Sequence, residues 1–195
     1  MKKWFKLALT LAAIGPLTLT APLANSQDSS FPRGKVALQV SDTGTFMARC
    51  RDCQETVEST NIRDTVVLHN QYSTPYAQFI VVPVGGGKIA LKSDNGKYLS
   101  WCNDCIKDGT FPDFIVINQN NPNSPKAQFT PKLLSNGNYG LKASTGKYLA
   151  RCRGCSPTAA ATGNRDVVAL AVLKGASPAT RPFAQWNIIS IPPEY

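Results

Sequence analysis

Short apolar runs separated by polar turns fill most of the chain, and the same order of runs occurs three times. Residues 34–53 read GKVALQVSDTGTFMARCRDC, residues 87–105 read GKIALKSDNGKYLSWCNDC and residues 137–155 read GNYGLKASTGKYLARCRGC. Each copy is followed by an acid that opens an apolar run, and later by an Ala-Gln-aromatic sequence. A period of about 50 residues indicates one supersecondary unit used three times.

Each unit predicts four short strands, because its apolar runs are short and bounded by turn residues. Tight-turn dipeptides, of which Asn95-Gly96 is the strongest, separate the first strand from the second. No window beyond the N-terminal segment repeats with a helical period. The first predicted strand covers 36–40; second strands begin at Phe46, Tyr98 and Tyr148; third strands open at Asp64, Asp113 and Asp166; fourth strands contain Ala77-Gln78-Phe79, Ala127-Gln128-Phe129 and Ala184-Gln185-Trp186.

The first 26 residues differ from the repeats and predict a signal peptide. Lys2, Lys3 and Lys6 precede an apolar stretch that covers 7–14 and resumes at Leu17, and small residues precede a cleavage position before Gln27. A membrane anchor is the alternative, but Gly and Pro break a run already shorter than the ~20 residues of a spanning helix. No other segment is apolar enough to cross a bilayer. The sequence therefore predicts a secreted or periplasmic protein with no membrane span in the mature chain.

Removal of this segment changes the charge of the chain. The full sequence has 21 basic and 12 acidic residues, a formal charge of +9, and the loss of three lysines leaves 18 basic residues and +6. A hydrophobic fraction of 43% argues against disorder. The sequence has one histidine, His69, and shows no phosphate loop, nucleophile elbow or paired carboxylates. We therefore expect a non-enzymatic protein, with no catalytic residue and no cofactor.

The three units are too small to fold separately, so residues 27–195 are expected to form one all-β domain with repeats at about 34–84, 85–134 and 135–191. Twelve strands with threefold repetition indicate a β-trefoil; a three-bladed repeat or a sandwich is the alternative. The repeated Gly-Lys-Tyr-Leu and Ala-Gln-Phe motifs resemble the fascin-like branch of the β-trefoil superfamily, and the resemblance covers the whole mature chain. It implies a six-stranded barrel capped by three hairpins. The cysteine pairs depart from the fascin pattern.

Each repeat carries one Cys-x-x-Cys pair, placed between its second and third strands. Export to an oxidising compartment favours disulfides, and the repetition favours local pairing, because we expect threefold-related loops to lie far apart. A redox pair and a zinc knuckle are the alternatives, but the helix context of redox motifs and the usual zinc spacing are both missing. We predict no metal and the bonds Cys50–Cys53, Cys102–Cys105 and Cys152–Cys155.

The residues beside the cysteines are the candidate binding residues. Arginine forks suit carboxylate, sulfate or phosphate, and an exposed tryptophan suits the face of a sugar. The position before the first cysteine holds Arg or Trp, which indicates a surface position; solvated loop charges are the alternative interpretation. The candidates are Arg49, Arg51, Trp101, Asp104, Arg151 and Arg153. Asp42 and Asp94, with Ser144 in the third copy, are interpreted as turn formers.

Together these observations predict lectin-like recognition of glycans, acidic glycans among them, by disulfide-braced loops. The expected partner is a glycan or another anionic surface ligand. The alternative is a secreted protein-interaction module, an effector or inhibitor with a protein partner. Nucleic acid is not an expected partner, because export and a modest charge argue against it.

Overall fold

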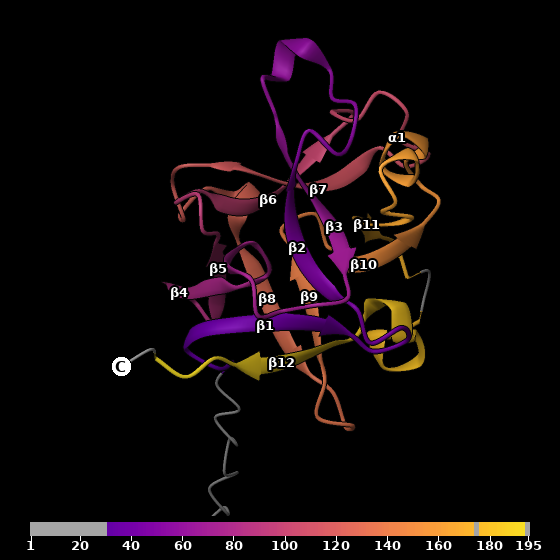
Figure 1. Cartoon of the computed structure of the whole chain (residues 1–195). Coiled ribbons are helices and arrows are strands. Elements are labelled where there is room, and N and C mark those ends of the chain that lie inside the picture. Colours follow the sequence, from indigo (N-terminus) through magenta and orange to yellow (C-terminus); the bar gives the residue numbers. More distant parts are fainter. Residues whose placement is uncertain (1–30, 174–175, 194–195) are drawn as a thin grey trace, which may run out of the picture.

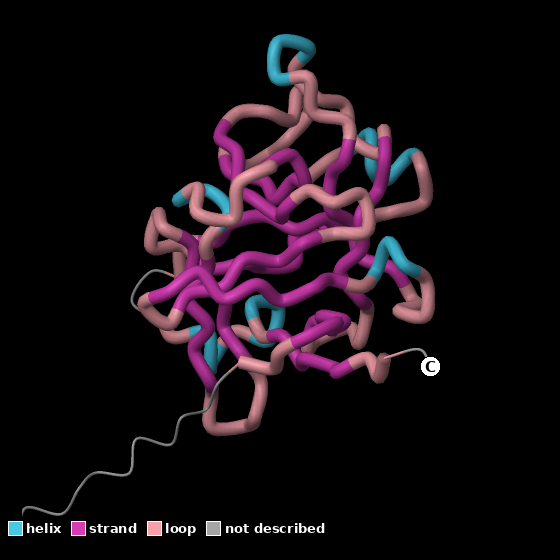
Figure 2. Tube along the Cα trace, turned by 90° about the vertical axis from the view of Figure 1, so that its left-hand side faces the viewer, coloured by secondary structure: helices cyan, strands magenta, loops and turns pink. Residues whose placement is uncertain are grey.

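The structure is a computed structural model that describes residues 31–173 and 176–193, and the predicted signal peptide lies outside these residues. Figure 1 shows two layers: a barrel in the lower half of the view, and three hairpins with their loops above it. Figure 2 shows strands through most of the molecule and only short helical turns between them. No helix within the described ranges is long and apolar enough to cross a membrane.

The barrel is a closed ring of six antiparallel strands. In the ring β1 pairs with β4 and β12, β5 pairs with β4 and β8, and β9 pairs with β8 and β12. Closure leaves no unpaired barrel edge. The barrel strands are β1 (Gly34–Val40), β4 (Phe79–Gly85), β5 (Lys88–Lys92), β8 (Phe129–Leu133), β9 (Tyr139–Ala143) and β12 (Trp186–Ser190).

Three antiparallel hairpins cap one end of this barrel. Their strands are β2 (Phe46–Arg51) with β3 (Asp64–His69), β6 (Tyr98–Asn103) with β7 (Asp113–Gln119), and β10 (Tyr148–Arg153) with β11 (Asp166–Ala171). The second strands of the three hairpins, β3, β7 and β11, pair with one another and close a triangle. The architecture is the predicted β-trefoil, and the second and third strands begin where the sequence predicts.

The aromatic residues of the fourth strands fill the interior of the barrel. Phe79, Phe129 and Trp186 are fully buried, and the Trp186 indole N–H donates to the Leu149 carbonyl at 3.1 Å. The aromatic residues that open the second strands differ in burial between the repeats. Phe46 is buried, whereas its counterparts Tyr98 and Tyr148 in repeats 2 and 3 are half-buried.

The Ala-Gln-aromatic segments differ from the prediction, because the strand begins only at the aromatic residue. A proline opens a short 3-10 helix before each strand, since its fixed backbone angle and missing N–H suit a first helical position. These helices are η2 (Pro75–Ala77), η3 (Pro125–Ala127) and η5 (Pro182–Ala184), and two more are η1 (Glu58–Thr60) and η4 (Pro178–Thr180). A short helix α1 (Pro157–Ala161), which the sequence analysis missed, begins at the cap residue Ser156.

Candidate functional site

The three cysteine pairs close the tips of the hairpins as predicted. Bonds join Cys50 to Cys53, Cys102 to Cys105 and Cys152 to Cys155, with Cα atoms 5.6, 5.9 and 5.7 Å apart, and no cysteine is free. The residue before the second cysteine is left-handed in every copy: Asp52 (φ 59°), Asp104 (φ 51°) and Gly154 (φ 69°). The N–H of each donates to the residue before the next strand, to Arg63, Pro112 and Arg165, at 2.7–2.8 Å. Disulfide and turn therefore complete one closed tip per repeat.

The expectation that these tips lie far apart is wrong. The pairing of β3, β7 and β11 brings them together, and cysteines of all three repeats share one buried cluster with Phe114 and Ile106. Backbone hydrogen bonds join neighbouring loops: Val57 N–H donates to the Cys105 carbonyl at 2.9 Å, and Thr110 N–H to the Cys155 carbonyl at 3.0 Å. Figure 1 shows these loops at the top of the view, on the side away from the C-terminus. The disulfides therefore form one apical layer rather than three separate tips.

Arg49 joins repeat 1 to repeat 2 instead of facing solvent. Its Nε and Nη2 donate to the two carboxylate oxygens of Asp94, both at 2.7 Å, and its Nη1 donates to Asp64 at 2.8 Å. Its side chain is only 20% exposed. The hydrogen bonds to Asp94 raise the pKa of Arg49, and they hold the pKa of Asp94 below its ordinary value against the opposing effect of burial.

Arg151 makes the matching link from repeat 3 back to repeat 1. Its Nε and Nη2 donate to Asp42 at 2.9 and 2.7 Å, and its Nη1 donates to Asp166 at 3.0 Å. The hydrogen bond to Asp42 raises the pKa of this guanidinium. Arg49 and Arg151 therefore each have two aspartate partners in place of a ligand.

Trp101 occupies the same position in repeat 2, and its partner is uncharged. The indole N–H donates to the Ser144 hydroxyl at 3.1 Å, and the ammonium of Lys126 lies 5.3 Å from the ring centroid. Trp101 is half-buried and packs against the barrel core. The acid of this repeat, Asp113, accepts instead from Lys147 and from Asn103. The Trp101 side chain therefore covers the seam between repeats 2 and 3, meaning the contact of this hairpin with the first turn of the next repeat.

These links explain a sequence feature that was interpreted as turn chemistry. Asp42, Asp94 and Ser144 occupy one repeat position, and each accepts from the Arg or Trp of the preceding repeat. Aspartate faces arginine, and serine faces tryptophan. The prediction that the Arg or Trp position faces solvent is therefore wrong, because a neighbouring repeat covers it.

The other three candidates lie at the exposed hairpin tips. Arg51 is 62% exposed, and its Nε lies 3.9 Å from the carboxylate of Asp52. Asp52 pairs more closely with Arg63, at 2.5 Å. Asp104 and Arg153 are exposed at the tips of repeats 2 and 3. Of the six candidates, Arg51 and Arg49 lie beside the same hollow of the surface.

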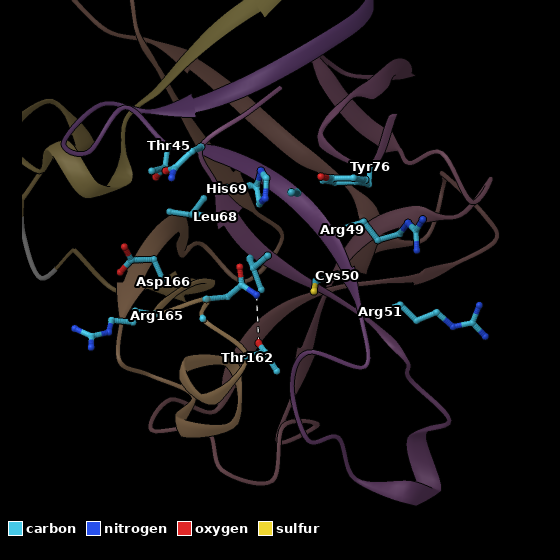
Figure 3. Close-up of a pocket in the computed structure, with 15 residues that line it drawn as sticks. Thr45, Arg49, Cys50, Arg51, Leu68, His69, Tyr76, Thr162, Arg165 and Asp166 are labelled. Carbon is cyan, nitrogen blue, oxygen red and sulfur yellow. Dashed lines mark hydrogen bonds between the residues drawn. The ribbon is translucent and has the colours of Figure 1, made fainter. Parts of the chain in front are cut away.

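This hollow is a groove of about 700 Å³ between the β2–β3 hairpin of repeat 1 and the loop that precedes β11 in repeat 3. His69 and Tyr76 form its aromatic part, with ring centroids 5.7 Å apart and the planes at 89°. Figure 3 shows this pair facing Thr162 across the groove. The Asn164 amide donates to Thr162 at 3.2 Å on that facing side. Polar and aromatic groups thus line opposite sides of one open cleft.

The charge at this groove is positive at its rim. Arg51 and Arg165 are exposed there, and Figure 3 shows them on opposite sides of the cleft. The lining acid, Asp166, is neutralised by Arg151, as described above. Neither His69 nor Tyr76 is among the binding residues that the sequence predicts. The available signal was a repeat difference: the position of Tyr76 is Lys126 in repeat 2.

The described residues form no cluster that would bind a metal ion. Over 31–173 and 176–193, no three His, Cys, Asp or Glu side chains gather as metal ligands would. The groove is therefore described by its aromatic, amide, hydroxyl and guanidinium groups.

No protein-family model matches the chain, and no curated protein is significantly similar to it. Solved structures are similar in fold. The designed threefold-symmetric protein ThreeFoil has a TM-score of 0.57 at 19% identity, with 81% of this chain and 99% of that chain covered. A salivary protein from Culex quiquefasciatus of the Cysteine and Tryptophan-Rich family has a TM-score of 0.58 at 15% identity, with 82% and 95% covered.

A Polyporus squamosus lectin bound to a human-type influenza-binding epitope has a TM-score of 0.55 at 14% identity, with 82% of this chain and 50% of that chain covered. Identities this low establish the shared fold, and β-trefoils carry unrelated functions. The comparisons therefore agree with the β-trefoil, and the function has to be argued from the groove.

Proposed function

We propose that this chain is an exported, non-enzymatic glycan-binding protein whose site is the groove between repeats 1 and 3. The observation that carries this proposal is the pairing of an aromatic wall, His69 and Tyr76, with amide and hydroxyl groups on the facing side. Saccharides present apolar C–H faces and a rim of hydroxyls. An aromatic ring contacts such a face, and Asn, Thr and Arg groups pair with the hydroxyls.

The rim arginines favour acidic saccharides over neutral ones. Arg51 and Arg165 carry the exposed charge. Arg49 also lines the groove, but two aspartates hold its side chain in place. Guanidinium groups bind carboxylate and sulfate through two parallel hydrogen bonds. A uronate or sulfated sugar therefore fits this groove better than an uncharged one. The three disulfides accord with export, because such bonds persist in oxidising compartments.

A glycan array that contains neutral, uronate and sulfated saccharides tests this proposal with the disulfide-bonded protein. We expect acidic glycans to bind, Tyr76→Ser to weaken them at least tenfold, and Arg51→Gln to weaken the acidic ones selectively. Phe183→Ser and Arg153→Gln are matched controls at the equivalent positions of repeat 3, outside the groove. Absence of binding to every glycan class, or equal losses in the controls, would refute the proposal.

Protein recognition is the second candidate, and it has its own observation. Phe111 is 47% exposed in the apical layer, beside a hollow of about 500 Å³ that Val57, Ile106 and Pro112 also line. An exposed phenylalanine with apolar neighbours is typical of a protein-binding anchor. Capture of a partner that is lost in Phe111→Ser and kept in Tyr76→Ser would favour this function; competition by free sugars would favour the first.

A further inference from the structure

A second groove lies on the other side of the same hairpin. It has a volume of about 260 Å³ and lies between the loop that precedes β3 in repeat 1 and the first turn of repeat 2. Asn61, Arg63, Lys97 and Asn118 are among its lining residues. It is the threefold counterpart of the first groove, because Arg63 directly precedes β3 as Arg165 directly precedes β11.

Arg51 lines both grooves. It ends β2, so the hairpin that separates the two hollows carries a cation at its edge rather than an apolar ridge. A chain that leaves the first groove across this edge therefore meets a guanidinium before it enters the second.

Exposed basic residues continue along this route. Arg165 stands at the first groove, Arg51 between the grooves, and Arg63 and Lys97 at the second. One exposed acid, Asp52, interrupts the series and pairs with Arg63 at 2.5 Å. The two less exposed acids that line the grooves are each paired with an arginine: Asp166 with Arg151, and Asp64 with Arg49. Four exposed cations against one exposed anion leave the route positive.

The third equivalent position does not continue the route. Pro112 replaces the arginine before the strand, and Asn103 replaces Arg51. Lys147, the counterpart of Lys97, forms an ion pair with the buried carboxylate of Asp113. The basic route therefore crosses two of the three interfaces between repeats and ends there.

We propose that the two grooves and Arg51 form one continuous site for a linear acidic saccharide longer than a disaccharide. This inference rests on the proposed function of the first groove and extends it. The ligand carries its acidic groups along the chain, so that separate carboxylates or sulfates meet the cations of the two grooves. The recognised feature is the spacing of acidic groups along an extended polymer.

Binding of size-defined saccharides tests the inference by calorimetry on the disulfide-bonded protein. One series consists of heparin-derived di-, tetra- and hexasaccharides, and the other of galacturonate oligomers of the same lengths, so that sulfate and carboxylate sources are distinguished. We expect affinity to rise at least tenfold from di- to hexasaccharide in one series, and to fall with added salt. Lys97→Gln should weaken the hexasaccharide about 3- to 10-fold while the disaccharide is unchanged. Lys132→Gln on β8 removes the same charge outside both grooves and should change neither.

The outcomes separate this inference from the proposed function. Binding of short and long saccharides with equal affinity, insensitive to Lys97→Gln, would overturn the two-groove site and leave the first groove intact. Tyr76→Ser should weaken binding at least tenfold at every length. Absence of all binding in both series would overturn the two proposals together.

Discussion

The seam between repeats 1 and 2 allows a quantitative test of what its arginine does. We consider Arg49→Gln, Asp94→Asn and the double variant. Both side chains are mostly covered, 20% and 23% exposed, and two parallel hydrogen bonds join them at 2.7 Å. At an effective dielectric constant of about 20, two charges about 4 Å apart attract by about 4 kcal/mol. Desolvation and the ordering of both side chains offset more than half of this, which leaves a net coupling of about 1–2 kcal/mol.

The assay is a double-mutant cycle of unfolding free energies from urea denaturation at pH 7. We expect each single variant to lose about 1.5–2 kcal/mol and the double variant to lose clearly less than the sum. Lys107 with Glu55 is the comparison pair, because their side chains are 41% and 54% exposed, and solvent screening should leave their coupling much weaker than that of the seam pair. Equal coupling in the two pairs would refute the structural role of the seam arginine.

The same cycle has a predicted pH dependence. Arg49 holds the pKa of Asp94 below its ordinary value, so the folded state favours the ionised carboxylate. This contribution is complete above the unfolded pKa of about 4 and is lost as the pH falls through the lowered folded pKa. The coupling energy should therefore be unchanged between pH 7 and about pH 5 and should disappear in acid, once the pH has fallen below the lowered pKa of Asp94. Coupling that persists in strong acid would contradict an ion pair.

Three further predictions concern repeats 2 and 3. Trp101→Arg with Ser144→Asp recreates the charged seam, so the double variant should be about 1 kcal/mol more stable than the two single changes add up to; strictly additive unfolding energies would contradict the matching rule. Asp104→Gly relieves a left-handed backbone and should raise stability by about 0.5 kcal/mol, measured by thermal unfolding, whereas a loss would contradict it. Burial opposes ionisation of Asp108, but hydrogen bonds from Thr158 and Ser156 hold its pKa below the ordinary value. One of these bonds comes from the backbone N–H of Thr158 in the first turn of α1. Asp108→Asn should therefore speed amide exchange in α1 and lower stability by about 1 kcal/mol; unchanged exchange would argue against a capping role for Asp108.

The repeats, the strand order and the disulfide pairs were accessible from the sequence because they depend on local patterns. Turn dipeptides, a proline or an acid at a strand end, and closely spaced cysteines act over a few residues. The seam was not accessible in this way, because Arg49 and Asp94 are 45 residues apart and Arg151 and Asp42 are 109 apart. Their partnership depends on which repeats become neighbours in the closed barrel.

The groove depends on differences between repeats, and a consensus pattern conceals such differences. Tyr76 lies where repeat 2 has Lys126, and Arg165 lies where it has Pro112. Each substitution looks like ordinary loop variation by itself. Only the folded arrangement places His69, Tyr76 and the loop of repeat 3 around one cleft. The sequence does not predict the apical layer for a related reason, since this layer forms only when β3, β7 and β11 pair with one another.

The seam contacts also give the barrel a direction, since every repeat donates to the next and accepts from the one before. In repeat 1 the donor Arg49 and the acceptor Asp42 are of matching kinds, whereas repeat 2 combines Trp101 with an aspartate and repeat 3 combines Arg151 with a serine. Three copies of the first repeat would thus satisfy one another head to tail around a closed trimer. Three copies of the second or third repeat would face mismatched partners at every junction. Only the first repeat therefore carries a donor and an acceptor that are complementary to each other, and the other two match only their present neighbours.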